Sequence, residues 1–110
     1  MKPIFTDYLS KYDGRVQELF SHVYRIAKNA CPDAEERLWA GLPSLYHQDK
    51  FIRIIAFKDH INIEAKGFVE HKNKLPNYRF TPKDMLQIFV GQEVPDGFLI
   101  EAFKDTLISR

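Results

Sequence analysis

The sequence contains a single cysteine, Cys31, and no long run of apolar residues. A lone cysteine excludes an internal disulfide framework and suits a reducing compartment. Because every apolar run is only a few residues long, no segment is predicted to cross a membrane. The N-terminal residues lack the continuous apolar core and the small-residue cleavage site of a signal peptide, so we expect a cytoplasmic protein.

The sequence also lacks an excess of either charge and the common catalytic motifs. Its net charge is +1, which is too small to attract nucleic acid or an anionic membrane through a global field. The glycines stand singly, which excludes a phosphate-binding glycine loop, and there is no Gly-x-Ser-x-Gly nucleophile elbow. The histidines do not form the closely spaced pairs that bind transition metals. We therefore predict a protein that is not an enzyme.

The apolar residues that are present suffice for one core. The chain has 110 residues, of which 45% are hydrophobic and 28% are charged. These values are ordinary for a globular domain, and a chain of this length buries one core rather than two. We therefore expect a single domain over residues 1–110.

Two long segments have the periodicity of amphipathic helices. From Gly14 to Ala30, apolar residues recur at spacings of three and four, and Asp13 is a suitable N-cap. A closing helix is predicted over residues 96–108, with the carboxylate of Asp96 favourably placed at its N-terminal end. Shorter helical segments are predicted over residues 4–10 and 67–74.

The periodicity changes to alternation after the first long helix. Strands are predicted over residues 36–40, 44–48, 51–57, 61–65 and 84–90. Gly41 and Pro43 are expected to separate the first two strands. Because the connections are short, successive strands should pair antiparallel. The sequence thus predicts an α+β domain, with a central antiparallel meander sheet of about five strands and N-terminal and C-terminal helices packed against it.

The third predicted strand is apolar on both of its faces. We expect one face to pack against the long helices through Phe51, Ile55 and Phe57. The other face would then carry Ile52, Ile54 and Ala56, and each isoleucine would lose about 1.5–3 kcal/mol if left in water. Only residues 4–10, residues 67–74 and the loop around Tyr78 and Phe80 remain to cover it.

Such short segments should cover that face only in part and leave a groove. Trp39 or Tyr46 is expected to line this groove, with Lys58 or His60 near one end, and these are the candidate ligand-binding residues. In the alternative interpretation Trp39 and Tyr46 complete the core and His60 caps a turn. A further alternative is a homodimer in which the apolar face meets its copy across a two-fold axis.

Two charged stretches are candidate sites of other kinds. The densest carboxylate cluster, Asp33, Glu35 and Glu36, could hold a divalent cation in a shallow and exposed site, although it also fits a solvated stretch with Arg37 as counter-charge. Residues 66–83 contain five basic side chains against one acid, together with three aromatic residues. That mixture can bind single-stranded nucleic acid, but a solvated helix and loop is the simpler interpretation.

Several motifs give the chain a resemblance to the YdhG-like domains of unknown function. An aromatic-Gly-apolar-Pro step is present as Trp39-Ala40-Gly41-Leu42-Pro43, with one residue inserted, and the Phe-Lys-x-His motif is present as Phe57-Lys58-Asp59-His60. The segment MLQIFVGQEVPDGFLIEAFKDTL resembles the closing strand, loop and helix of that family. The resemblance extends over nearly the whole chain.

This resemblance implies a compact α+β fold of frataxin-like appearance. Some members are described as intracellular iron chaperones, so the resemblance also implies weakly bound iron and iron–sulfur assembly proteins as partners. A hard cation of this kind takes oxygen ligands, and an open coordination shell lets it leave. The acidic cluster at Asp33, Glu35 and Glu36 is where we would expect it to bind.

Overall fold

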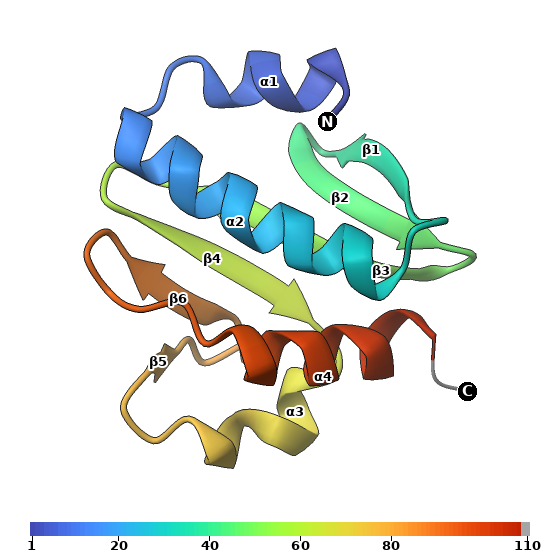
Figure 1. Cartoon of the computed structure of the whole chain (residues 1–110), viewed down its shortest axis with the longest axis vertical. Helices are drawn as coiled ribbons and strands as arrows, with labels where there is room; N and C mark the ends of the chain where they lie inside the picture. The colour runs from blue at the N-terminus through green and yellow to red at the C-terminus, as the bar shows by residue number, and fades with distance from the viewer. Residues whose placement is uncertain (109–110) are drawn as a thin grey trace.

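The structure is a computed structural model that describes residues 1–108. Its helices are α1 (Pro3–Leu9), α2 (Gly14–Ala30), α3 (Phe68–His71), the 3₁₀ helix η1 (Lys72–Lys74) and α4 (Asp96–Leu107). Its strands are β1 (Glu35–Trp39), β2 (Leu42–His47), β3 (Lys50–Ala56), β4 (His60–Ala65), β5 (Arg79–Phe80) and β6 (Leu86–Phe89). Figure 1 shows their arrangement.

The strands form one antiparallel sheet of six strands in the order β1-β2-β3-β4-β6-β5. The first four follow one another as a meander, and β6 returns along the free edge of β4 (Figure 1). The predicted α+β fold with terminal helices on a central sheet is confirmed. The sequence did not predict β5, because two residues are too short to show alternation.

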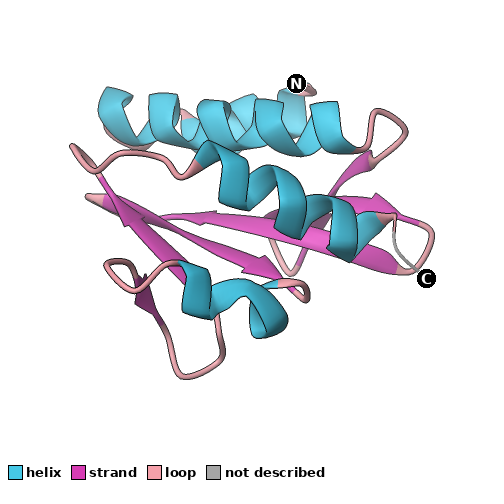
Figure 2. Ribbon diagram, turned by 60° about the horizontal axis from the view of Figure 1, so that its bottom comes forward, coloured by secondary structure: helices cyan, strands magenta, loops and turns pink. Residues whose placement is uncertain are grey.

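The helices α1, α2 and α4 lie together on one face of the sheet (Figure 2). We call this the inner face. Its side chains, which form the core with the buried faces of these helices, are Leu45, Ile52, Ile54, Ala56, Ile61, Ile63, Ala65, Leu86 and Ile88. The helix α3 makes its main contacts with α4 rather than with a strand, and Phe68 packs there on the rings of Phe98 and Phe103. The other face of the sheet is the outer face.

The predicted orientation of β3 is wrong. Ile52 and Ile54 are the side chains that pack under the helices, with exposed fractions of 0% and 2%, whereas Phe57 is 39% exposed. Phe51 and Ile55 point to the outer face, where they are half-buried. The register explains this choice, because Arg53 shares their face and lies opposite the polar residues of β2 and β4. If β3 were turned over, the guanidinium of Arg53 would lie in the apolar core.

The prediction of which segments cover the second face of β3 is also wrong, because it depended on that orientation. We expected residues 4–10 to shield the face opposite the long helices, but α1 lies on the inner face beside α2 (Figure 2). Its Tyr8 hydroxyl accepts a hydrogen bond of 2.9 Å from the Ala56 N–H at the end of β3. The inner face is therefore covered by three helices, and within residues 1–108 no helix makes its main contacts with the outer face.

The turn between β1 and β2 is tighter than we predicted. Ala40 and Gly41 both have positive φ, 51° and 80°, as the central residues of a two-residue hairpin often do. Pro43 does not separate two strands but lies within β2, opposite Leu38. It is tolerated because the pairing of β2 with β3 stops at Ser44, so the missing N–H of the proline breaks no bond to β3.

The helix boundaries agree with the local sequence. The Asp13 side chain accepts a 2.8 Å hydrogen bond from the Arg15 N–H and caps α2, as predicted. The α3–η1 segment lies close to α4: a Cβ added at Gly67 would lie 2.6 Å from the Ala102 carbonyl oxygen. Of the helices in the described part of the chain, none has the length and apolar character needed to cross a membrane.

Candidate functional site

The outer face brings side chains from five strands into one surface. The pairing registers place on it Glu35, Arg37, Trp39, Leu42, Ser44, Tyr46, Phe51, Arg53, Ile55, His60, Asn62, Glu64, Gln87 and Phe89, with Phe57 continuing from the end of β3. Six of these residues have aromatic rings, counting histidine. This surface carries most of the residues that the sequence singled out, so we consider it the candidate functional site.

Arg53 is the centre of the first cluster on this face. Its guanidinium carbon lies 4.2 Å from the ring centroid of Trp39 and 4.2 Å from that of Phe51. Such cation–π contacts favour arginine, because its planar and weakly hydrated cation stacks on rings. The Arg53 residue is only 4% exposed, whereas Trp39 is 54% exposed. The tryptophan therefore contacts the arginine while much of its own surface stays in solvent.

The hydrogen bonds of Arg53 account for its burial. Nε donates to the Ser44 hydroxyl at 2.9 Å, and Nη1 donates to the Glu64 carboxylate at 2.9 Å. Nη2 donates to the Tyr46 hydroxyl at 3.2 Å. Burying a charge is costly unless it is paired and hydrogen-bonded, and these three acceptors meet both conditions. They also fix the orientation of the surrounding rings.

His60 is the centre of a second cluster, at the other end of the outer face. Its ring stacks on Phe57 at 4.5 Å between centroids and on Phe89 at 4.7 Å. Its Nδ1 lies 2.8 Å from a carboxylate oxygen of Asp59 in the preceding turn. The histidine is thus held between two aromatic side chains and oriented by a neighbouring acid.

The structure divides the predicted groove residues between these two clusters. Trp39 and Tyr46 contact Arg53, whereas His60 lies on β4, three strands from β1 or about 14 Å across the sheet. Lys58 is exposed in the turn between β3 and β4. The four residues therefore share one broad face rather than converging on one ligand.

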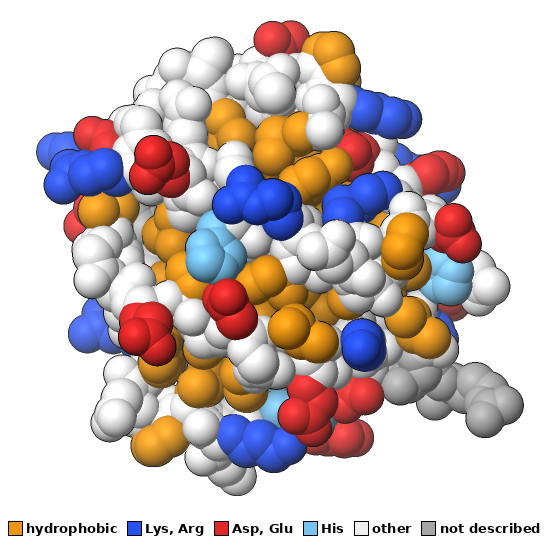
Figure 3. Space-filling model, viewed as in Figure 1, with side chains coloured by type: hydrophobic (Ala, Val, Ile, Leu, Met, Phe, Trp, Pro, Cys, Tyr) orange, Lys and Arg blue, Asp and Glu red, His pale blue; other side chains and the backbone are white. Residues whose placement is uncertain are grey.

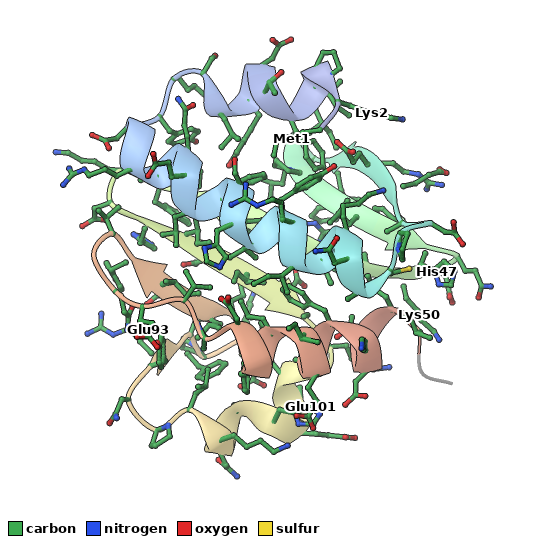
Figure 4. The ribbon with its side chains drawn as sticks, viewed as in Figure 1. Met1, Lys2, His47, Lys50, Glu93 and Glu101 are labelled. Atoms are coloured by element: carbon green, nitrogen blue, oxygen red, sulfur yellow. The ribbon has the colours of Figure 1, made fainter. Side chains whose placement is uncertain are left out.

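The carboxylates considered for metal binding have other partners. The two oxygens of Glu36 accept hydrogen bonds of 2.7 Å each, from the Lys2 backbone N–H and the Tyr24 hydroxyl. Lys2 lies at the start of α1, beside β1 (Figure 4). Burial disfavours the charged form of Glu36, but these hydrogen bonds and nearby positive charges outweigh it and hold the pKa of Glu36 below its ordinary value. Burial, followed by the bond to the carboxylate, raises the pKa of Tyr24 to about 12.

The remaining acids do not complete a metal site with Glu36. Glu35 forms an ion pair with Arg37 at 3.0 Å, and Asp33 is exposed in the turn before β1. Within residues 1–108, no three Asp, Glu, His or Cys side chains are grouped so that they could hold a metal ion. On the face covered by the helices, acids are scattered among bases rather than gathered along α2 (Figure 3).

In the basic stretch, residues 66–83, two of the five basic side chains form ion pairs. Lys72 binds Asp84 at 2.7 Å, and Lys74 binds Glu101 of α4 at 3.1 Å. Its aromatic residues do not form an open stacking surface: Phe68 is fully buried and packs edge-on against Phe80. This arrangement agrees with the simpler interpretation, a structural helix and loop.

Comparisons of this chain with protein-family models, with curated proteins and with solved structures found no match. The resemblance to YdhG-like domains therefore stays a prediction from sequence motifs.

Sequence reasoning missed the residue that organises the outer face. Arg53 did not stand out, because a single arginine in an apolar strand has no motif around it. The available signal was its position: a charged residue among isoleucines, in a strand with no polar face, requires buried partners. The polar residues opposite it, Ser44 and Glu64, become visible only when the register is known.

Proposed function

We propose that this chain is a non-enzymatic protein-binding module, that its outer face is the interface, and that a second copy of the chain binds there. The observation that carries this proposal is the exposure of large apolar side chains on a sheet face that no helix of residues 1–108 covers. Trp39 is 54% exposed and Phe57 is 39% exposed. Large apolar side chains left exposed on one face can mark an interaction site, and Trp, Tyr and Arg contribute most to binding energy at interfaces.

The size of the outer face fits a dimer interface. Five strands at a spacing of about 4.8 Å, each about 20 Å long, cover roughly 500 Å² in projection. Two such faces in contact would together bury on the order of 1,000 Å², which is the lower end of the range for specific interfaces.

The charges of the outer face favour a second copy over nucleic acid. Arg53 is neutralised by Glu64 and Arg37 by Glu35, in both cases within the same chain. A face whose ions are internally paired does not repel its copy. Nucleic acid binding requires uncompensated cations along the backbone path, and in residues 1–108 only Arg79, on the edge strand β5, brings an unpaired arginine to this face.

Sedimentation equilibrium over a series of concentrations tests the proposal. The wild-type mass should rise from 12.9 kDa toward twice that value. Trp39→Lys and Phe57→Lys should each weaken the dimer about tenfold or more. Ile100→Lys is the matched control, because Ile100 is 41% exposed but lies on α4. A protein that stays monomeric up to about 1 mM, or a dimer insensitive to both outer-face variants, would refute self-association through this face.

The iron-chaperone role implied by the resemblance to YdhG-like domains stays a separate proposal. A ferrous ion at Asp33, Glu35 and Glu36 would have to displace the hydrogen bonds of Glu36 and the ion pair of Glu35. Anaerobic Fe(II) titration followed by NMR separates the two proposals. Selective line broadening at these three residues would support the iron role, and it would leave the outer-face proposal untouched.

A further inference from the structure

A cleft lies at the end of the sheet where β3 begins and β4 ends. It has a volume of about 500 Å³, within the usual range for small-molecule sites. Figure 4 shows Lys50, which lines it, beside the C-terminal end of α4. Phe51, Ala65 and Val69 form its apolar wall, and Val69 is 58% exposed there. The cleft meets the outer face only at its rim, through Phe51 and Glu64.

Two of the three acids that line the cleft are neutralised by bases outside it. The Glu64 carboxylate accepts from Arg53 at 2.9 Å, and the Asp84 carboxylate accepts from Lys72 at 2.7 Å. Neither of these bases lines the cleft. The third acid, Asp49, is exposed in the turn between β2 and β3. The uncompensated negative charge facing the cleft is therefore smaller than the number of carboxylates that line it suggests.

The positive charge facing the cleft is not neutralised in the same way. Lys66 and Lys83 line it from opposite ends of the basic stretch, and neither forms an ion pair within residues 1–108. The other two lysines of that stretch, Lys72 and Lys74, are paired with acids. Of the three bases of that stretch that form no ion pair within residues 1–108, two therefore line this cleft, and the third, Arg79, lies on β5.

We propose that the cleft binds a small organic anion, with a carboxylate or phosphate head group on a compact apolar body. Lys66 and Lys83 would bind the head group through charge-assisted hydrogen bonds, which are stronger than neutral ones. The apolar body would cover Val69 and the edge of Phe51. The cleft is too small for a folded partner, and this inference does not depend on self-association.

NMR titration of the full chain with three probes tests this inference. Phenyl phosphate and benzoate should cause saturable shifts at the amides of residues 49–51, 65–69 and 83–84, with Kd of about 1 mM or below. Inorganic phosphate should bind several-fold more weakly, because it leaves the apolar wall in water. The relative affinities of phenyl phosphate and benzoate distinguish a phosphate from a carboxylate ligand.

A pair of double variants makes the test specific. Lys66→Gln with Lys83→Gln should weaken probe binding about tenfold or more, since each lysine donates to a charged group. Lys2→Gln with Lys11→Gln removes the same charge at exposed positions on either side of α1 and should leave binding unchanged. Equal weakening by both pairs, or shifts that never saturate, would overturn the inference. Trp39→Lys, which disrupts the proposed dimer interface, should still bind the probes, so failure of one proposal does not imply failure of the other.

Discussion

At the scale of single residues, Arg53 shows how a buried charge can organise a surface. Its guanidinium lies between two rings and donates to three acceptors from the neighbouring strands. We expect Arg53→Lys to lower the free energy of unfolding by about 1–3 kcal/mol, because lysine cannot reproduce the planar stacking or the three-way donation. Urea unfolding measures this difference.

Arg37→Lys is the control for this prediction. Arg37 pairs with Glu35 and lies 5.0 Å from the Tyr46 ring centroid, but both side chains of the pair are 54% exposed, and contacts this exposed contribute little. The free energy of unfolding of the Arg37→Lys variant should stay within about 0.5 kcal/mol of that of the wild type. If Arg53→Lys is as mild as Arg37→Lys, the Arg53 cluster is not a structural centre.

Glu36 should make stability depend on pH. Its pKa in the folded chain is below its ordinary value, so the unfolded chain binds the proton more tightly. The carboxylate therefore stabilises the fold above the unfolded pKa, about 4.5, and this contribution disappears as pH falls through the lower folded pKa. Glu36→Gln should be less stable than the wild type near neutral pH, with the difference shrinking in acid.

Urea unfolding at several pH values measures that difference. Glu18→Gln, at an exposed position on α2, is the matched control and should follow the wild-type pH profile. A difference between Glu36→Gln and the wild type that does not change with pH would mean that the hydrogen bonds from Tyr24 and Lys2 do not favour the charged form.

At the scale of elements, the contact between α3 and α4 depends on a glycine. A Cβ at Gly67 would lie 2.6 Å from the Ala102 carbonyl oxygen and 2.9 Å from the Thr106 hydroxyl. The carbonyl belongs to the helix backbone and cannot rotate away. Gly67→Ala should therefore displace α3 and cost about 2 kcal/mol or more in thermal or urea unfolding.

Gly97→Ala is the matched control on α4. A Cβ at Gly97 meets no atom within 4 Å, so alanine should be neutral or stabilise the helix by about 0.5–1 kcal/mol. NMR shift changes confined to α3 and α4 would locate the effect of Gly67→Ala. If that variant is as stable as Gly97→Ala, the two helices are not packed as closely as the structure has them.

At the scale of the whole molecule, the fold has two layers. Three helices cover the inner face, while Trp39 and Phe57 remain exposed on the outer face. Self-association belongs to this scale, since it would supply a third layer. The fluorescence of Trp39, the only tryptophan, reports on it directly. Acrylamide quenching should be strong in dilute solution and weaken as the protein concentration rises; quenching that does not change with concentration would count against the dimer.

The sequence by itself determined the elements and the fold class. The stripe in Gly14–Ala30, the N-cap at Asp13 and the alternation in the following strands are local patterns, and local patterns determine helices and strands. Short connections then restricted the strands to an antiparallel meander, which predicted most of the sheet.

Only the tertiary structure decided which face of β3 is buried and which side chains meet. The sequence of a strand with two apolar faces does not determine which face is buried. That depends on the residues paired with it in the neighbouring strands. Pairing placed Arg53 between Ser44 and Glu64, and the return of β6 placed Phe89 against His60. These contacts join residues far apart in the chain, so no local pattern contains them, and they are what separated Trp39 from His60 and created the outer face.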